Sequence, residues 1–185
     1  MVASLKGRLL VASPALEDPN FARSVVYLCA HDENGALGLI LNRPLETAPV
    51  GDHLPQWMEH VDRPAVFFEG GPVEPGAALA LAAREPSLPD TGWLDVATGL
   101  GLLNLDSEPA VVAGHLRALR LFTGYGGWSA GQLEAEIKEE AWFVVDAVAE
   151  DMFRPETATL WRDVLLRQPG KLAMFAFFPG DLRAN

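Results

Sequence analysis

Residues 24–41 read SVVYLCAHDENGALGLIL, and this stretch predicts how the sheet of the protein begins. Residues 24–30 are rich in β-branched and aromatic side chains, and residues 37–41 form a second apolar run. Between them, Asn34-Gly35 is the strongest short signal for a β-hairpin, because its turn positions adopt positive φ angles. Gly38, inside the second run, indicates a bulge or a close approach of another backbone. The stretch therefore predicts two antiparallel strands joined by a tight turn.

The other apolar runs predict further short strands, which cover residues 9–12, 65–68, 93–97, 102–105, 121–123, 142–145 and 172–178. Helical spacing predicts helices over residues 108–120, 129–140 and 155–168, and the proline-containing residues 45–64 predict a loop around a short helix near residues 56–60. Residues 77–83 fit either a helix or a strand. Because early strands join by hairpins and helices follow later, we expect an α+β fold. It forms a single domain over residues 1–185, with a mixed, mostly antiparallel sheet flanked by helices.

The charge and the cysteine content exclude several classes of protein. Lys and Arg number 14 against 25 Asp and Glu, and the resulting net charge of −11 argues against contact with nucleic acid phosphates. The one cysteine, Cys29, cannot form an internal disulfide or a zinc ribbon, and its apolar neighbours predict a buried thiol. No apolar stretch approaches the ~20 residues that cross a bilayer, and no signal-peptide pattern is present. We therefore expect a cytoplasmic protein that does not enter a membrane.

Residues 127–131, GWSAG, match the G-x-S-x-G nucleophile elbow of α/β-hydrolases. In that fold the catalytic histidine follows the serine, yet all four histidines of this chain precede Ser129. Ser129 and Gln132 also form a capping-box pair, which gives the serine a structural role at a helix start. His31, at the mouth of the hairpin, fits a surface histidine bonded within its own turn. The histidines lack metal-binding spacing, and we assign no catalytic residue, no metal and no cofactor.

Two glycine-containing turns are candidate ligand sites. Glu69-Gly70-Gly71-Pro72 follows a predicted strand, and it fits either an anion-binding nest of N–H groups or a chain reversal that needs positive φ. Residues 124–128, GYGGW, lead into a predicted helix that carries Gln132 and Glu136 on one face. This second turn fits either a ligand cradle or a structural corner whose aromatic side chains fill the core. Spacing alone does not separate these two interpretations.

Several motifs occur together in a known order. LVASP at residues 10–14 is followed by DPNFARSV at 18–25, HDENGALGLILNRP at 31–44, GGPV at 70–73 and GYGGWSAGQLEAEI at 124–137. With these motifs the chain closely resembles the AlgH/YqgE family of uncharacterised bacterial proteins. The resemblance implies a compact α+β domain with a partly split sheet. It also implies a transcriptional-regulator label, which comes from a genetic association with alginate production in one member. Residues 77–83 lack the histidine that often ends this strand in the family.

The resemblance further implies that the motif residues gather around one surface cleft. The candidate cleft residues are His31, Asn34, Asn42, Arg43, Glu69, Gly70, Gly71, Tyr125, Trp128, Gln132 and Glu136.

From these residues we expect a binding or adaptor protein with an indirect regulatory role, whose cleft takes a small molecule or a peptide of a protein partner. Arg43 would supply charge-assisted hydrogen bonds. One alternative is a hydrolase that uses the same cleft, with His31 or Glu69 as general base. The other is a DNA-binding regulator. The charge disfavours it, because the nearest approach to a basic cluster is Arg117 and Arg120 on one predicted helix.

Overall fold

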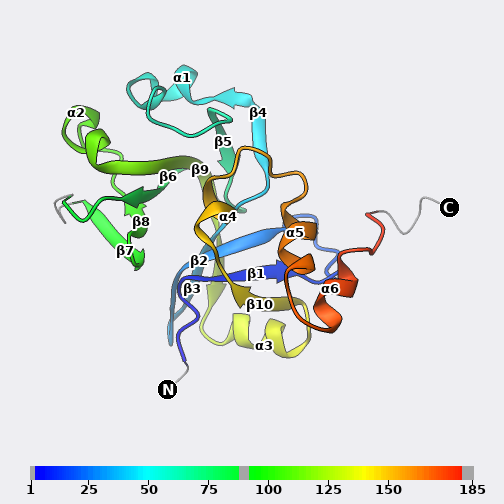
Figure 1. Ribbon diagram of the computed structural model, residues 1–185. Coiled ribbons are helices and arrows are strands. Elements are labelled where there is room, and N and C mark those ends of the chain that lie inside the picture. Colours follow the sequence, from blue (N-terminus) through cyan, green and yellow to red (C-terminus); the bar gives the residue numbers. More distant parts are fainter. Residues whose placement is uncertain (1–2, 88–91, 181–185) are drawn as a thin grey trace.

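The computed structural model describes residues 3–87 and 92–180, and it shows a curled sheet with helices packed around it (Figure 1). The strands are β1 (Arg8–Ala12), β2 (Val25–Asp32), β3 (Gly35–Ile40), β4 (Pro44–Pro49), β5 (Val66–Glu69), β6 (Val73–Arg84), β7 (Trp93–Ala97), β8 (Leu100–Leu103), β9 (Leu116–Ser129) and β10 (Trp142–Asp146). The α-helices are α1 (Val50–His53), α2 (Pro109–Val112), α3 (Gln132–Lys138), α4 (Ala149–Phe153), α5 (Leu160–Leu166) and α6 (Lys171–Phe175). Two 3₁₀ turns, η1 (Pro55–Trp57) and η2 (Ala113–His115), complete the elements.

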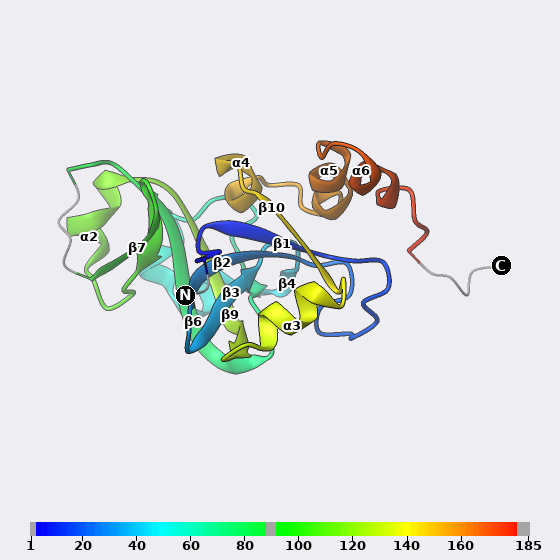
Figure 2. The same cartoon turned by 90° about the horizontal axis from the view of Figure 1, so that it is seen from below.

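The sheet has the order β10-β1-β2-β3-β9-β6-β8-β7, and β5 joins β4 to β9 beside this path. The β5–β9 pairing is parallel, and the other pairings are antiparallel. Strand β9 joins the two halves of the sheet, because its residues 116–125 pair with β6 and its residues 126–129 pair with β3. The predicted α+β fold with a mixed, mostly antiparallel sheet is therefore confirmed. Figure 2 shows α5 and α6 at the opposite end of the molecule from α2 and β7.

The predicted hairpin is present as β2 and β3, but its turn differs from the expectation. Asp32 pairs with Gly35, and of the turn residues only Gly35 has a positive φ, at 139°. The Asp32 carboxylate accepts a 2.7 Å hydrogen bond from the Asn34 N–H, which stabilises the turn without a positive φ at Asn34. At Gly38 the expected close approach is confirmed, because an added Cβ would lie 2.5 Å from the Val26 side chain.

Two segments form strands because of pairing partners far away in the sequence. The ambiguous residues 77–83 belong to β6, which is hydrogen-bonded on both sides, to β8 and β9. The helix predicted over residues 108–120 is wrong, since only a short α2 and η2 precede β9. Within β9, Leu119 and Leu121 pack in one core cluster and Phe122 in another, which is the alternation of a strand. Sheet pairing here overrides helix propensity.

Four other element predictions need correction. Residues 45–64 contain the strand β4, whose prolines are tolerated because it lies at an edge of the sheet. Helix α3 begins after Gly131, which has φ 75°, and not at Ser129. The helix predicted from residue 155 begins at Leu160. The strand predicted over residues 172–178 is wrong, because Leu172, Phe175 and Ala176 turn one helical face of α6 toward the core.

The largest core cluster lies between the sheet and α4, α5 and α6, and it includes Cys29, Phe122 and Trp161. Cys29 is a free, buried cysteine, as the sequence predicts, and burial raises the pKa of its thiol to about 12. The thiol is therefore protonated and unreactive in the folded protein near neutral pH.

Candidate functional site

The eleven candidate cleft residues do not line one cleft in the structure. Gln132 and Glu136 lie on helix α3, and His31 and Trp128 contact this helix from β2 and β9. Asn42 and Arg43 lie after β3, beside the loop of residues 13–24. The remaining candidates stand where β5, β6 and β9 meet, except Asn34 in the hairpin turn.

The residues around Glu136 form a closed hydrogen-bonded cluster, which we call the tryptophan corner (Phe21, Trp128, Gln132, Glu136 and Trp142). Both indole N–H groups, of Trp128 and Trp142, donate to Glu136 Oε2 at 2.9 Å, and the Gln132 amide donates to Oε1 at 2.9 Å. Phe21 packs against both indoles, with ring centroids 5.7 and 5.5 Å apart. Both carboxylate oxygens therefore accept hydrogen bonds from the protein itself. Of the two interpretations that the sequence left open, the contacts support the structural corner.

His31 is buried, with 6% of its surface exposed, and is not the surface histidine that the sequence predicts. Its Nδ1 accepts the Leu5 N–H at 2.9 Å, so the proton is on Nε2, which donates to Glu134 Oε1 at 2.8 Å. The backbone N–H of Glu134 and this His31 contact lower the pKa of the Glu134 carboxyl. Both ring nitrogens are therefore occupied.

Ser129 does not pair with His31. Its N–H and hydroxyl both donate to Gln132 Oε1, at 3.0 and 3.3 Å. This contact is one half of the predicted capping box, although the helix itself begins later. The geometry at Ser129 therefore shows no nucleophile–base pair of the kind that a hydrolase elbow requires.

The Glu69-Gly70-Gly71 turn packs tightly against β9. A Cβ on Gly70 would lie 2.2 Å from the Gly124 carbonyl oxygen, and a Cβ on Gly71 would lie 2.2 Å from the Gly126 nitrogen. The Glu69 N–H donates to the Arg43 carbonyl and the Gly70 N–H to the Thr123 carbonyl, both at 2.9 Å. These amides are engaged within the backbone and do not form an anion nest. Tyr125, opposite Val73, packs against the largest core cluster.

Asn42 and Arg43 hold the loop that precedes β2. The Asn42 side chain accepts the Val25 N–H at 3.0 Å and donates to the Arg23 carbonyl at 2.9 Å. The Arg43 guanidinium donates to the carbonyls of Asn20 at 2.6 Å and Ala22 at 3.1 Å. Between these supports Arg23 adopts a left-handed conformation, with φ 55°, which is uncommon for a residue with a side chain. Asn42 and Arg43 thus fix the position of Arg23.

This supported loop faces α5 and α6 across a hollow of about 620 Å³, which we call the arginine hollow. Its lining residues are Ala22, Arg23, Asn42, Arg43, Ala158, Thr159, Trp161, Arg162, Ala176, Phe177 and Phe178. The Arg23 guanidinium lies 4.4 Å from the centroid of the Trp161 ring, and its Nη2 donates to the Phe178 carbonyl at 2.6 Å and to the Pro179 carbonyl. The Arg162 guanidinium lies 5.8 Å from the Phe177 ring centroid.

The charge of the arginine hollow is uniformly positive. Arg23, Arg43 and Arg162 line it, and no Asp or Glu of residues 3–87 and 92–180 does. Within those residues none of the three forms an ion pair with a carboxylate. Other arginines do form such pairs, namely Arg8, Arg84, Arg117, Arg154 and Arg167. In a chain with 25 acidic residues, three arginines around one hollow that form no ion pair within the described residues make this hollow a candidate site for an external anion.

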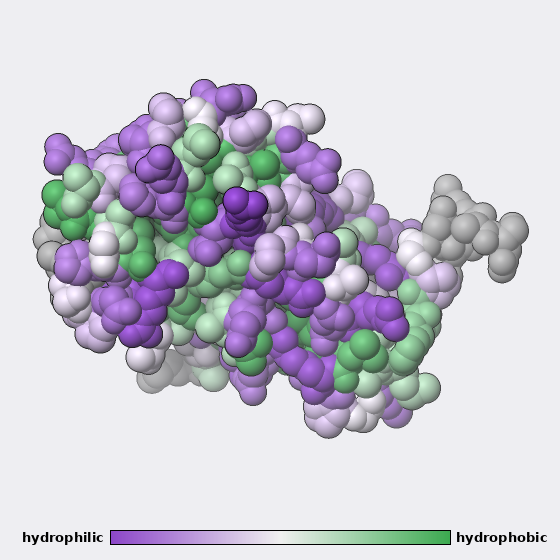
Figure 3. All heavy atoms as spheres, turned by 45° about the horizontal axis from the view of Figure 1, so that its top comes forward, coloured by the Kyte–Doolittle hydropathy of each residue, from purple (hydrophilic) through white to green (hydrophobic). Residues whose placement is uncertain are grey.

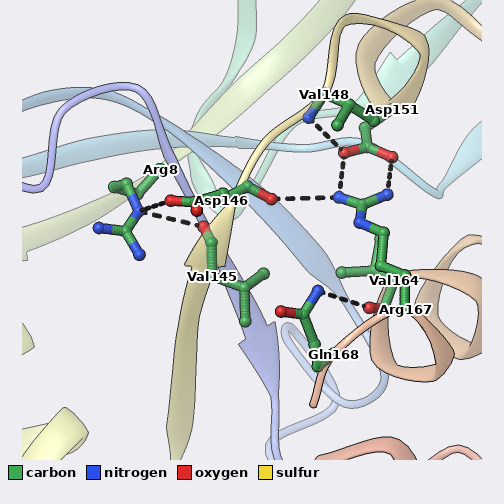
Figure 4. Close-up of polar contacts among 8 residues, drawn as sticks. All are labelled: Arg8, Val145, Asp146, Val148, Asp151, Val164, Arg167 and Gln168. Atoms are coloured by element: carbon green, nitrogen blue, oxygen red, sulfur yellow. Dashed lines mark hydrogen bonds and ion pairs between the residues drawn. The ribbon is translucent and has the colours of Figure 1, made fainter.

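An ion pair between the buried Asp151 and the exposed Arg167 anchors the helix that carries Trp161 and Arg162. Figure 4 shows Arg167, at the end of α5, donating to both oxygens of Asp151 at 2.7 and 2.5 Å. Asp151 is 2% exposed and also accepts the Val148 N–H at 2.9 Å, while Arg167 donates to the Asp146 carbonyl at 3.1 Å. This bidentate contact raises the pKa of Arg167 and ties α5 to α4 and β10.

The other arginines singled out by the sequence do not form a basic face. Arg117 pairs with the exposed Glu85 through two hydrogen bonds. Arg120 is buried over the Phe68 ring and donates to the carbonyls of Arg63 and of residues 152–154, and burial lowers its pKa to about 10. Neither guanidinium is placed to contact phosphates. Among the described residues no His, Cys, Asp and Glu group could hold a metal ion.

Sequence analysis missed Arg23, Trp161 and Arg162. Arg23 lies inside the DPNFARSV motif, but no sequence pattern indicates that it contacts α5. A comparison of every arginine with its potential carboxylate partners would have identified Arg23 and Arg162, but this comparison requires the structure. No helix in the described part of the chain has the length and apolar character needed to cross a membrane.

Comparisons with known proteins agree with this fold. A family model described as AlgH-like matches residues 9–173. A UPF0301 protein from Thermobifida fusca (strain YX) is 50% identical over 191 residues, covering 98% of this chain and 96% of the relative. A UPF0301 protein from Streptomyces coelicolor is 47% identical over 192 residues, covering 100% and 97%. The crystal structure of a Corynebacterium diphtheriae protein superposes with a TM-score of 0.88 at 29% identity, covering 96% and 94%. The solution structure of the AlgH protein from Pseudomonas aeruginosa gives a TM-score of 0.71 at 30% identity, covering 98% and 100%.

Proposed function

This chain belongs to the AlgH-like family, and we propose that it is a cytoplasmic binding protein whose arginine hollow takes a small anion, free or as the acidic group of a peptide. The observation that carries the proposal is the convergence of Arg23, Arg43 and Arg162 without a carboxylate among the described lining residues. A regulatory role would then follow from ligand-dependent contact with a protein partner, not from contact with DNA.

The hollow offers the chemistry that anions need. Guanidinium groups bind carboxylate or phosphate oxygens through paired, charge-assisted hydrogen bonds. Arg23 is held in place by the Trp161 ring below it and by the support of Asn42 behind it, so little conformational entropy is lost when an anion binds. Arg162 is exposed, its guanidinium lies over the Phe177 ring, and among the described residues it forms no ion pair, although its charge contributes to lowering the pKa of the neighbouring Asp163. Its guanidinium can therefore meet the anion from the other side.

A cytoplasmic location accords with the chemistry of Cys29. The thiol is buried and free, and reducing compartments keep such thiols unpaired. Fractionation of cells that express the chain tests this part of the proposal. Recovery in the cytosolic fraction is expected, and recovery in a membrane or secreted fraction would contradict it.

The test of binding is isothermal titration with citrate and with inorganic phosphate at low ionic strength. The decisive variant is Arg162→Gln, because its side chain makes no hydrogen bond that holds the described fold together. Arg117→Gln is the matched control, with the same change of charge at an arginine outside the hollow. Loss of one charge-assisted contact should weaken binding about tenfold or more in Arg162→Gln and leave the control close to wild type.

Binding should also weaken as salt is added, because screening reduces the field of exposed charges. Equal affinities in the two variants, or no heat of binding for either anion, would contradict the proposal. Arg23→Gln provides a second variant from a different element, and its affinity should fall in parallel with that of Arg162→Gln.

A further inference from the structure

A second hollow lies on the other side of α6 and has a different character. It measures about 650 Å³ and is lined by Ser13, Pro14, Ala15, Glu139, Glu140, Phe143, Lys171, Leu172, Phe175 and Phe178. Its apolar lining is formed mainly by Phe143, Leu172 and Phe175, whereas Glu139 and Glu140 are exposed carboxylates. We call it the aromatic hollow. Lys171 also lines this hollow, so its charged groups are two carboxylates and one ammonium, and the excess negative charge disfavours an anionic group there but not an apolar chain.

Phe178 belongs to the lining of both hollows. Its carbonyl accepts the hydrogen bond from Arg23, and its ring lies 5.6 Å from the Phe175 ring. The Phe175 ring in turn stacks on Phe143 at 5.1 Å. Three aromatic rings therefore run in series from the arginine hollow into the aromatic hollow, and together they form a continuous apolar path.

This end of the molecule also exposes large apolar side chains. Phe177 and Met174 are each 69% exposed, and Phe178 is 43% exposed. Figure 3 shows apolar surface at the right-hand end of the view, the end where Figure 1 places α5 and α6. Exposed apolar surface of this size usually marks a binding site. Its position beside three arginines that form no ion pair among residues 3–87 and 92–180 specifies the kind of occupant.

We propose that the anion bound by this protein is a single-chain amphiphile. Its carboxylate head occupies the arginine hollow and its alkyl tail passes over Phe178 into the aromatic hollow. This inference rests on the proposed anion binding and adds the chemical class of the ligand. Charge fixes the orientation, because the arginines attract the head and Glu139 and Glu140 repel it. The proposed ligand is a soluble, monomeric amphiphile and not the surface of a bilayer.

The test is a titration of the full chain with hexanoate, octanoate and decanoate, each below its micelle concentration. A fully buried methylene strengthens binding about fourfold. From hexanoate to decanoate we therefore expect affinity to rise by about tenfold to a few hundredfold, depending on how deeply the tail is buried. Decanol, which has the tail without the charge, should bind at least about tenfold more weakly than decanoate.

Two variants separate the tail from the head. Leu172→Ser should flatten the chain-length dependence while leaving citrate affinity near wild type, because Leu172 lines the aromatic hollow and not the arginine hollow. Met174→Ser is the matched control, since Met174 is exposed and lines neither hollow. The chain-length series on the wild-type protein needs no variant, so a poorly folded Leu172→Ser protein does not leave the inference untested.

The outcomes distinguish this inference from the proposed function. Citrate binding that depends on Arg162, with equal affinity for hexanoate and decanoate, would overturn the amphiphile and leave anion binding intact. Decanol binding as tightly as decanoate would also overturn it, as would binding to anionic phosphatidylglycerol vesicles without binding to monomeric decanoate. Failure of citrate, phosphate and decanoate alike would remove both proposals.

Discussion

The tryptophan corner predicts a large loss of stability when the Glu136 carboxylate is removed. In Glu136→Met the side chain keeps its length and helix propensity but can no longer accept the two indole N–H groups. Trp128 and Trp142 are 5% and 2% exposed, so neither donor finds water in the folded state. The corner would therefore keep its packing and lose its acceptor.

The magnitude follows from those two donors. A buried donor without a partner costs about 1–3 kcal/mol, so two give about 2–6 kcal/mol, with a central value of about 4 kcal/mol. For a domain of this size about 1 kcal/mol corresponds to about 2–4 °C, which places the fall in Tm at about 8–16 °C. Thermal unfolding followed by circular dichroism, together with urea unfolding, measures both quantities.

The control is Glu139→Met, which makes the same change at an exposed position at the end of α3 and should alter stability by less than about 0.5 kcal/mol. If the corner were a ligand cradle, Glu136→Met would keep the stability of the wild type and lose binding of citrate. That result would refute the interpretation of the corner as structural, whereas a destabilised variant with intact binding at low temperature supports it.

Three further predictions follow from single residues. The pKa of Glu134 is lowered in the folded state, so its charge stabilises the fold above its ordinary pKa, and this contribution disappears as the pH falls through the lowered value. Glu134→Gln should therefore lose less stability than the wild type between about pH 5 and 3. Urea midpoints measured across that range test this prediction. Gly71→Ala should destabilise the fold by about 3 kcal/mol or prevent soluble expression, since the added Cβ would clash with β9 and the φ of Gly71 is 155°. Gly76 has open space around it, so the control Gly76→Ala should change the urea midpoint little. Equal effects of the two substitutions would refute the close-packing argument. Cys29, with its pKa raised to about 12, should react with a disulfide reagent at pH 8 only after unfolding, and rapid labelling of native protein would contradict its burial.

Sequence predicted the parts of the fold that depend on local patterns. The β2–β3 hairpin follows from two apolar runs and a turn, and the buried Cys29 follows from its apolar neighbours. Of strand β9 only residues 121–123 were predicted as a strand. Its first residues could not be predicted, because Val112, Leu116 and Leu119 have helical spacing and the strand is formed by pairing with the distant β6. In α6 the run LAMFAFF at residues 172–178 is apolar at every position, so its helical period is hidden.

The candidate site was predicted only in part for a similar reason. Asn42 and Arg43 do line the arginine hollow, yet Arg43 uses its guanidinium on the Asn20 and Ala22 carbonyls. Arg23 meets Trp161 only because α5 packs back against the start of the sheet, a contact between opposite ends of the chain. The motifs rich in glycine and tryptophan were predicted as candidate ligand sites, and in the structure they are closely packed parts of the fold.

The central claim, that anions bind at the arginine hollow, is tested most directly by the indole N–H signals in a ¹H–¹⁵N NMR titration with citrate. The five tryptophans give separate signals that single Trp→Phe variants assign. The Trp161 indole lies directly beneath the Arg23 guanidinium, so its signal should shift with citrate and saturate, while those of Trp128 and Trp142 stay in place. Shifts of Trp128 and Trp142 with an unchanged Trp161 signal would contradict the account and return the site to the tryptophan corner.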